Sequence, residues 1–113
     1  MHILEKPIKR VDLKPMEKKM FGNLVKAVVD IEKKIVALDA EMHADLEQLL
    51  LEHGSEQKNL WGINFYSEMI GDDFVEFDSM INVRPSQNNR SRGVDDPEVR
   101  KKILEVVNIW ITK

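Results

Sequence analysis

Apolar residues recur along this chain at two spacings, and each spacing predicts one type of element. In some segments every second residue is apolar, which indicates a strand with one buried face. The alternation is most regular in residues 74–83, which we therefore predict to form the best-defined strand. Trp61, Ile63 and Phe65 alternate in the same way and are expected to point into the core. The predicted strands are residues 2–8, 25–31, 35–40, 60–66 and 74–83.

Where apolar residues recur three or four positions apart, the spacing predicts three helices. The first is expected to begin at Asp12 and to end at Gly22. The second covers residues 43–53 and ends at Gly54, and the third begins at Asp96. Aspartate is a favoured N-cap, and glycine readily adopts the left-handed conformation that ends a helix. The residues expected to face the core are Leu13, Met16, Met20 and Phe21 in the first helix, Met42, Leu46, Leu49 and Leu50 in the second, and Val99, Ile103, Val106, Val107 and Trp110 in the third.

The predicted elements follow the order β-α-β-β-α-β-β-α, which indicates an α+β fold. We expect a mainly antiparallel sheet with the helices packed on one face. The first six elements have the order of a ferredoxin-like (split βαβ) domain, which would leave an extra strand and a C-terminal helix. Because 113 residues can build one modest hydrophobic core, residues 1–113 are expected to form a single domain.

The composition narrows the classes of protein that fit this chain. Without cysteine, it has neither disulfides nor the thiolate ligands of zinc and iron–sulfur sites. No apolar run is long enough to span a membrane, and the N-terminal residues lack the apolar segment of a secretion signal. We therefore expect a cytoplasmic protein that does not enter a membrane.

Charge is unevenly distributed, although the net charge is only −3. Residues 39–78 contain eleven Asp or Glu and a single lysine, Lys58, whereas the segments on either side are mildly basic. One interpretation is a polarity that attracts a charged partner. The other is that the charged residues form solvated faces on different elements.

The most distinctive segment is Arg84-Pro-Ser-Gln-Asn-Asn-Arg-Ser-Arg92, between the last predicted strand and the last helix. Arginine supplies planar, bidentate donors that suit phosphate and carboxylate groups, and short amides and hydroxyls add neutral donors. The segment also leads to a helix N-terminus, which attracts anions, although Asp95 and Asp96 compete for that position. The candidate anion-binding residues are Arg84, Ser86, Asn88, Asn89, Arg90 and Arg92.

Two interpretations of this segment remain open. In the leading hypothesis it binds an anion, which is a nucleotide, an RNA phosphate or the carboxylates of a protein partner. In the other, its arginines pair with the acidic residues of segment 39–78 and hold the last helix against the sheet. No nucleic-acid-binding motif is present and the sequence pI is about 5.6, so strong nonspecific binding to nucleic acid is not expected.

A second group of candidate residues lies at the start of the second predicted helix. Histidine titrates near neutral pH, and Glu47 lies one turn beyond His43 on the same face, where it could orient the imidazole. In this alternative the protein is a hydrolase or nuclease, and the arginines stabilise developing negative charge. No metal or cofactor is predicted, because further ligands would have to come from His2 or His53 without a recognisable zinc spacing. The candidate catalytic residues are Glu41, His43, Asp45 and Glu47.

Polar residues also line one side of segment 74–83, where Glu76, Asp78 and Asn82 recur with the period of a strand and Arg84 extends the row. Asn64 joins them if its own strand pairs with this segment as a hairpin. The row could bind a cation or a polar substrate, or it could be the solvated side of an antiparallel sheet. A third class of function is an interaction protein, for instance a homodimer, with an exposed apolar patch and no deep pocket.

Three runs of residues resemble a known family: Glu41-Met-His-Ala-Asp-Leu-Glu47, Leu60-Trp-Gly-Ile-Asn-Phe-Tyr66 and Phe77-Asp-Ser-Met-Ile-Asn-Val-Arg-Pro-Ser-Gln-Asn-Asn-Arg-Ser-Arg-Gly-Val94. The family is a small prokaryotic domain family of unknown function that occurs in archaea and bacteria. The resemblance extends over nearly the whole chain and is most specific in the Trp-Gly-Ile-Asn and Ile-Asn-Val-Arg-Pro-Ser-Gln runs. It implies a single-domain cytoplasmic protein without an assigned activity, so it adds no functional residues.

Overall fold

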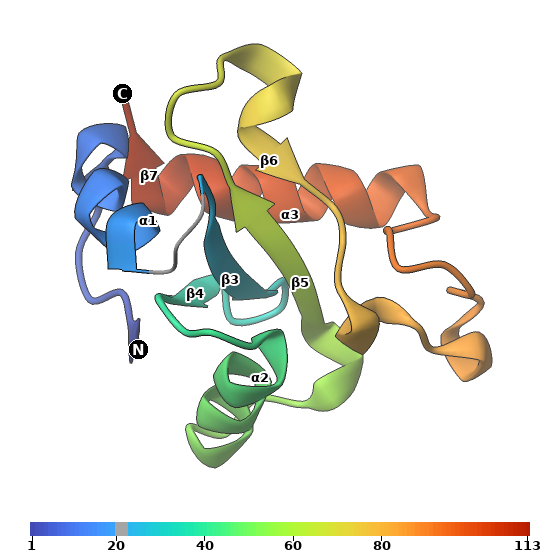
Figure 1. Ribbon diagram of the computed structural model, residues 1–113. Coiled ribbons are helices and arrows are strands. Elements are labelled where there is room, and N and C mark those ends of the chain that lie inside the picture. The colour runs from blue at the N-terminus through green and yellow to red at the C-terminus, as the bar shows by residue number, and fades with distance from the viewer. Residues whose placement is uncertain (20–22) are drawn as a thin grey trace.

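The computed structural model describes residues 1–19 and 23–113 and has a mixed α+β fold (Figure 1). Within these residues, five strands form one sheet in the order β1-β4-β3-β5-β6, and every neighbouring pair is antiparallel. Two further strands, β2 and β7, pair in parallel. The strands are β1 (His2–Ile3), β2 (Ile8–Lys9), β3 (Val25–Asp30), β4 (Ile35–Leu38), β5 (Leu60–Phe65), β6 (Val75–Glu76) and β7 (Ile111–Thr112). The predicted α+β class and antiparallel sheet are confirmed.

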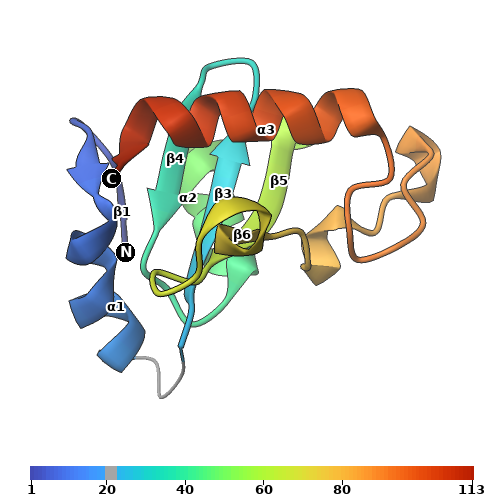
Figure 2. The ribbon, with the colours of Figure 1, turned by 90° about the horizontal axis from the view of Figure 1, so that it is seen from above.

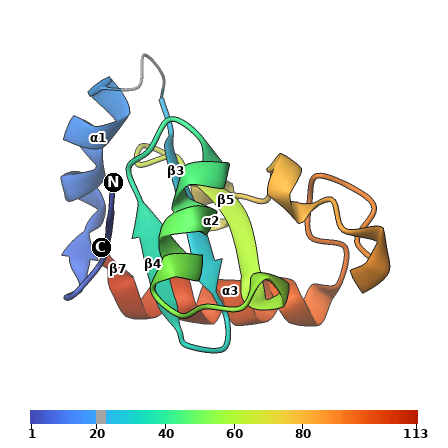
Figure 3. The ribbon, with the colours of Figure 1, turned by 90° about the horizontal axis from the view of Figure 1, so that it is seen from below.

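In the described part of the chain, three α-helices and five short 3₁₀ helices connect these strands. The α-helices are α1 (Lys14–Lys19), α2 (His43–Glu52) and α3 (Pro97–Trp110). The 3₁₀ helices are η1 (Arg10–Leu13), η2 (Gln57–Asn59), η3 (Gly71–Phe74), η4 (Met80–Asn82) and η5 (Pro85–Gln87). Figure 3 shows α2 in front of the strands, and Figure 2 shows α3 crossing them on the other side. No helix of residues 1–19 and 23–113 has the length and apolar character that a membrane crossing requires.

The prediction that the helices pack on one face of the sheet is wrong, because the central strand is buried on both sides. In β3, Ala27 and Val29 belong to the apolar cluster that includes the buried residues of α3. Val28 belongs to a second cluster, which it forms with Leu46 and Leu50 of α2. A strand that is apolar on both faces lacks the alternation that would distinguish a covered face from an open one.

The strand order differs from that of a ferredoxin-like domain. In that fold the last strand of the β-α-β-β-α-β unit flanks the first one. Here the corresponding strand, β5, pairs with β3 along its whole length, from Val25↔Phe65 to Asp30↔Leu60, and β1 stays at the edge. A six-residue ladder satisfies far more backbone hydrogen bonds than the two residues of β1 could offer.

The single strand predicted for residues 2–8 is divided into β1 and β2. After β1, the backbone N–H of Leu4 still donates to the carbonyl of Val36 (2.9 Å), and the chain then leaves the sheet. Pro7 cannot continue a ladder as a donor because it has no N–H. The next residues pair instead with β7, which brings the N-terminal segment beside the end of α3 (Figure 1).

The predicted ends of the helices are confirmed in part. Asp96 caps α3, since its carboxylate accepts a hydrogen bond from the backbone N–H of Glu98 (2.9 Å). Gly54 follows α2 with a φ of +98°, a conformation that favours glycine. Asp12 is not the N-cap of the first helix, because its carboxylate lies inside η1 and accepts a hydrogen bond from the backbone N–H of Lys9 (2.9 Å).

In the described part of the chain, the apolar stripes predicted for the helices are buried or half-buried against the core, with one exception. Leu46 and Leu50 are fully buried, whereas Met42 is 59% exposed because the chain is still extended at this N-cap position. Leu13 and Met16 pack against the core as predicted. The other residues predicted for that helix lie outside the described residues, namely Met20, Phe21 and Gly22. In α3 the residues that pack into the core are Val99, Ile103, Val106, Val107 and Trp110.

The strand predicted for residues 74–83 is mostly absent. Only Val75–Glu76 pairs with β5, and the chain then turns through η4. The side chain of Asn82 replaces the missing ladder, since its Oδ1 accepts from the N–H of Gly62 (2.8 Å) and its Nδ2 donates to the carbonyl of Gly62 (3.0 Å). Asn82 is therefore fully buried and does not belong to an outward polar row. Alternation alone does not distinguish a strand from a segment whose side chain pairs with a neighbouring backbone.

We expect Asn82→Ala to lower the free energy of unfolding by about 3 kcal/mol, because it leaves the N–H and the carbonyl of Gly62 unpaired in the interior. The matched control is Asn108→Ala, at an exposed position of α3, which should change this free energy by less than about 0.5 kcal/mol. Urea unfolding followed by circular dichroism measures both values. Equal effects of the two substitutions would contradict the role assigned to Asn82.

Candidate functional site

Two of the predicted anion-binding residues, Arg84 and Asn89, point into the protein. The guanidinium of Arg84 donates hydrogen bonds to the carbonyls of Gln57 and Leu60. It also lies 4.3 Å from the centre of the Trp61 ring. Burial lowers the pKa of Arg84. Arg84 therefore anchors the 84–93 loop to the start of β5.

The amide of Asn89 organises the turn of the same loop and is almost fully buried. Its Nδ2 donates to the backbone carbonyls of Asn82 (2.7 Å) and Gly93 (2.9 Å). Its Oδ1 accepts a hydrogen bond from the backbone N–H of Asp95 (2.8 Å). These bonds use both ends of the amide, so in this conformation Asn89 shapes the loop from within.

The loop also holds an anion of its own, the carboxylate of Asp95. One carboxylate oxygen accepts a hydrogen bond from the hydroxyl of Ser91 (2.6 Å), and the other accepts one from the backbone N–H of Arg90 (3.2 Å). The hydrogen bond from Ser91 lowers the pKa of Asp95. Asp95 thus occupies donors that an external anion would use. Ser86, Asn88 and the side chain of Arg90 remain at the surface.

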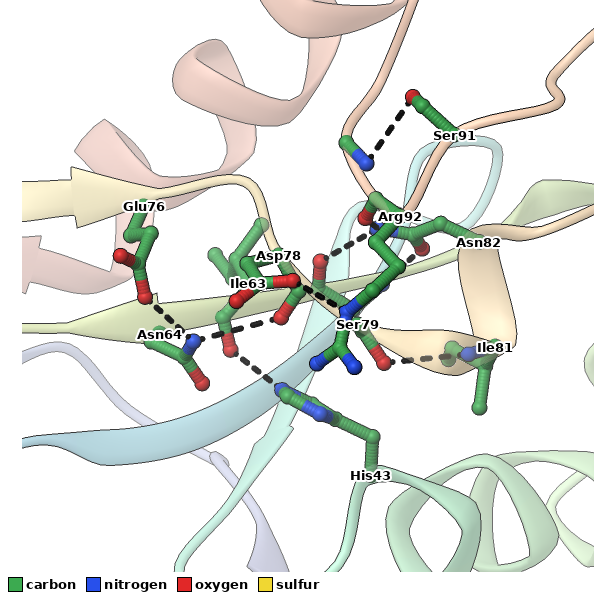
Figure 4. Close-up of polar contacts among 12 residues, drawn as sticks. His43, Ile63, Asn64, Glu76, Asp78, Ser79, Ile81, Asn82, Ser91 and Arg92 are labelled. Carbon is green, nitrogen blue, oxygen red and sulfur yellow. Dashed lines mark hydrogen bonds and ion pairs between the residues drawn. The ribbon is translucent and has the colours of Figure 1, made fainter.

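Arg92 reaches the acidic middle of the chain. Its Nε donates to the carboxylate of Asp78 (2.7 Å), so the predicted pairing of the loop arginines with segment 39–78 is confirmed for this pair. Both side chains are about half exposed. The terminal amino groups of the Arg92 guanidinium have no hydrogen-bond partner among residues 1–19 and 23–113. In Figure 4 they point toward the side on which His43 lies.

His43 is the first residue of α2 and is buried against β5 (Figure 4). Its Nε2 lies 2.8 Å from the carbonyl oxygen of Ile63. Because a carbonyl oxygen only accepts, Nε2 carries the proton and Nδ1 keeps its lone pair. Burial lowers the pKa of His43 below its ordinary value of 6.5, although the hydrogen bond to Ile63 and the charge of Asp78 oppose the shift. The imidazole is therefore neutral at pH 7 and has a fixed tautomer.

Asn64 connects the polar side chains of β5 and β6. Its Nδ2 donates to the carboxylate of Glu76 (2.8 Å) and to the backbone carbonyl of Asp78 (3.3 Å). The hydroxyl of Tyr66 donates to the same oxygen of Glu76 (2.9 Å), and burial raises the pKa of Tyr66. The predicted polar row is thus confirmed for Asn64, Glu76 and Asp78.

Gly62 allows the elements of the site to approach one another. A Cβ at this position would lie 2.6 Å from Cβ and Oγ of Ser79 and 3.2 Å from Cδ2 of His43. Ser79 is buried, and its Oγ accepts a hydrogen bond from the backbone N–H of Ile81 (3.2 Å). No role for Gly62 is predicted from the sequence. An isolated glycine inside a strand is nevertheless a signal that another segment approaches closely.

We use the name His43 face for the group formed by His43, Asn64, Glu76, Asp78 and Arg92. Each predicted set of functional residues contributes to it: the catalytic set provides the histidine, the anion-binding set provides the arginine, and the polar row provides the other three. The group combines a neutral imidazole, an amide, two carboxylates and a guanidinium. Such a face can bind a polar molecule through several different hydrogen-bonding groups.

The other predicted catalytic residues do not join the His43 face. In the described part of the chain, Glu41 and Asp45 are exposed and make no hydrogen bond to it, and the charge of Glu47 acts on Arg84. Among residues 1–19 and 23–113, no three His, Asp or Glu side chains are grouped so that they could hold a metal ion. Four surface hollows of about 350 to 700 Å³ are lined by neither His43 nor the 84–93 loop.

The fold and the His43 face define a small mixed α+β protein whose sheet carries a cluster of polar side chains beside the start of α2. The chain belongs to the DUF5674 family, which is described as a protein of unknown function, and the family model matches residues 2–110. The resemblance to a family of unknown function is thus confirmed over nearly the whole chain. No curated protein and no solved structure matches the chain.

We expect the folded protein to lose stability as the pH falls below about 6.5. The pKa of His43 is lower in the folded than in the unfolded chain, so below this pH the unfolded chain takes up a proton that the folded chain does not. Urea unfolding between about pH 5 and 7 measures the slope, which His43→Gln should reduce. His53→Gln, at an exposed position beyond α2, is the control and should keep the slope. An unchanged slope in the His43 variant would contradict this account.

Proposed function

We propose that the protein binds a small anionic molecule and that Arg92 makes the main contact. The observation that supports this proposal is the state of the Arg92 guanidinium. Its Nε is held by Asp78, whereas its terminal amino groups lack a partner in the described part of the chain. A guanidinium held at one edge presents its other donors in a fixed geometry, which suits an oxygen anion. It also loses less conformational freedom when the ligand binds.

This proposal narrows the anion-binding set predicted from the sequence. Arg84 and Asn89 already donate to carbonyl oxygens inside the protein, so they are not available without a rearrangement of the loop. Arg90 is exposed, and no residue among those described holds its guanidinium. Arg92 is the loop arginine that combines an exposed guanidinium with a carboxylate that orients it.

The charges around the His43 face limit the affinity for a simple anion. Lys26 of β3 is close enough to affect the pKa of His43 and adds positive charge. Glu76 and Asp78 add negative charge on the other side. Because these charges largely offset one another, we expect a dissociation constant on the order of 1 mM for inorganic phosphate. A larger ligand with further contacts would bind more tightly.

A second candidate function is acid–base catalysis by His43. The observation that favours it is the neutral imidazole, whose tautomer is fixed by Ile63 and whose Nδ1 keeps a lone pair. A neutral imidazole on the same face of the protein as a guanidinium can pair a general base with a group that stabilises developing negative charge. Hydrolysis of bis(4-nitrophenyl) phosphate that His43→Gln abolishes would support this candidate. No hydrolysis by the unmodified protein would rule it out for phosphodiesters.

We expect Arg92→Ala to weaken the binding of inorganic phosphate at least about tenfold, because charge-assisted hydrogen bonds contribute about 1.5–3 kcal/mol each. NMR titration of the backbone amides measures the affinity. In the unmodified protein the shifts should concentrate at His43, Asn64, Asp78 and Arg92.

The matched control is Arg90→Ala, which removes the same charge from the same loop. Because long-range attraction between exposed charges is screened by salt, this substitution should change the affinity less than about twofold. Equal losses in the two variants would attribute binding to general charge attraction and contradict the proposal. So would the absence of any shift in the unmodified protein.

A further inference from the structure

The orientation of the Asn64 amide is set by its neighbours. Its Nδ2 lies beside the carboxylate of Glu76 (2.8 Å) and the backbone carbonyl of Asp78 (3.3 Å), and both of these groups only accept hydrogen bonds at neutral pH. The amide therefore cannot be turned over to place its oxygen there. Its Oδ1 must point the other way.

This Oδ1 is a buried acceptor that lacks a hydrogen-bond partner among residues 1–19 and 23–113, and Asn64 as a whole is 4% exposed. Buried polar atoms are nearly always hydrogen-bonded, so an acceptor left without a donor needs an explanation. A hydrogen-bonding contact with the Asn64 amide raises the pKa of His43, but less than the bond between Nε2 and the carbonyl of Ile63 (2.8 Å), which holds the ring proton. Oδ1 of Asn64 thus receives no full hydrogen bond and is directed to the side of the sheet where the proposed ligand contact lies.

One residue, Asp78, positions both Asn64 and Arg92. Its backbone carbonyl accepts from the Asn64 amide, and its carboxylate accepts from Nε of Arg92 (2.7 Å). Figure 4 shows the Asn64 oxygen and the terminal nitrogens of Arg92 on the side of Asp78 that faces His43. A ligand on this face therefore meets fixed cationic donors. It reaches the fixed neutral acceptor, which is covered in this conformation, once the side chains over it move.

We propose that the ligand is an oxyanion that still carries an O–H group, namely a protonated phosphate, either free or as a monoester. Its charged oxygens accept from the terminal amino groups of Arg92, and its O–H donates to Oδ1 of Asn64. This inference rests on the proposed function, and it makes Asn64 a specificity-determining residue. Sulfate has the same shape but no O–H at neutral pH, so it would leave Oδ1 unpaired, and a site built to pair such a group rejects the analogue that lacks it.

The charged and titratable groups around Asn64 also favour a protonated phosphate over sulfate. The two carboxylates disfavour a fully deprotonated dianion, and the neutral histidine does not compensate for a second negative charge. Charge alone could therefore favour protonated phosphate over sulfate, and the test must separate charge from the amide. The groups are Lys26 of β3, His43 of α2, Tyr66 directly after β5, Glu76 of β6, and Asp78 and Arg92 of the adjoining segments.

The test compares inorganic phosphate with sulfate at equal ionic strength and about pH 6, near the second pKa of phosphate groups. NMR titration of the unmodified protein should show at least about tenfold tighter binding of phosphate. Asn64→Leu removes the acceptor and should bring the ratio of the two affinities close to one. Asn108→Leu, on the exposed side of α3, is the control and should keep the ratio. Glycerol 3-phosphate in a third titration distinguishes a monoester from free phosphate, and preference for either over sulfate supports the proposal.

A second measurement needs no variant and applies even if Asn64→Leu does not fold. When the pH rises from about 6 to about 8, a phosphate monoester such as glycerol 3-phosphate loses its only O–H proton, whereas sulfate does not change. Inorganic phosphate keeps one O–H over this range and is not used in this measurement. The preference for glycerol 3-phosphate over sulfate should therefore decline as the pH rises. A constant preference would overturn the role of the O–H group.

The remaining outcomes separate this inference from the proposed function. Equal affinities for phosphate and sulfate, both weakened by Arg92→Ala, would overturn the role of Asn64 and leave the anion site in place. A preference that persists in Asn64→Leu would assign selectivity to charge and overturn the inference as well. Binding of neither anion would overturn the proposed function together with it.

Discussion

The pairing of the Asn82 side chain with the backbone of Gly62 is the constraint on which the site depends. Along one edge β5 is paired with β3, but along the other β6 covers only its last two residues. Asn82 satisfies the exposed N–H and carbonyl of Gly62 where the ladder has ended. Its Nδ2 and the N–H of Ser79 both donate to the carbonyl of Arg92, so the same contact brings the 84–93 loop to the sheet.

Because Gly62 has no side chain, Ser79 and His43 can pack closely against β5. Ser79 and His43 occupy the space where a Cβ would stand, so the start of α2 is drawn against β5 and the imidazole loses most of its contact with water. Burial in turn keeps His43 neutral. The neutral state of the histidine therefore follows mainly from its burial, which outweighs the effects of the neighbouring charges of Lys26 and Asp78 on its pKa.

Some polar residues of the 84–93 loop stabilise the protein itself, whereas another presents its donors at the surface. Arg84, Asn89 and Asp95 satisfy carbonyls, amides and hydroxyls of the protein itself, which a long irregular connection needs in order to be ordered. Among the residues that the structure describes, Arg92 is held by a single carboxylate, and its terminal amino groups have no partner. Arginines of the same loop thus differ in whether their donors can bind a ligand. The difference arises from contacts with segments that lie far away in the chain.

Local patterns determined much of this protein: strands β3, β4 and β5 and helices α2 and α3 follow from apolar spacing and end signals that act within a few residues. The same patterns singled out His43, Asp78 and Arg92 as candidates, but in three separate groups. Tertiary structure alone decided that these groups meet, that Arg84 turns inward, and that β6 ends early. Each of these outcomes depends on pairing between segments that are distant in the chain. In one case a single buried amide takes the place of a strand. The spacing of residues along the chain carries no information about which distant segments will pair.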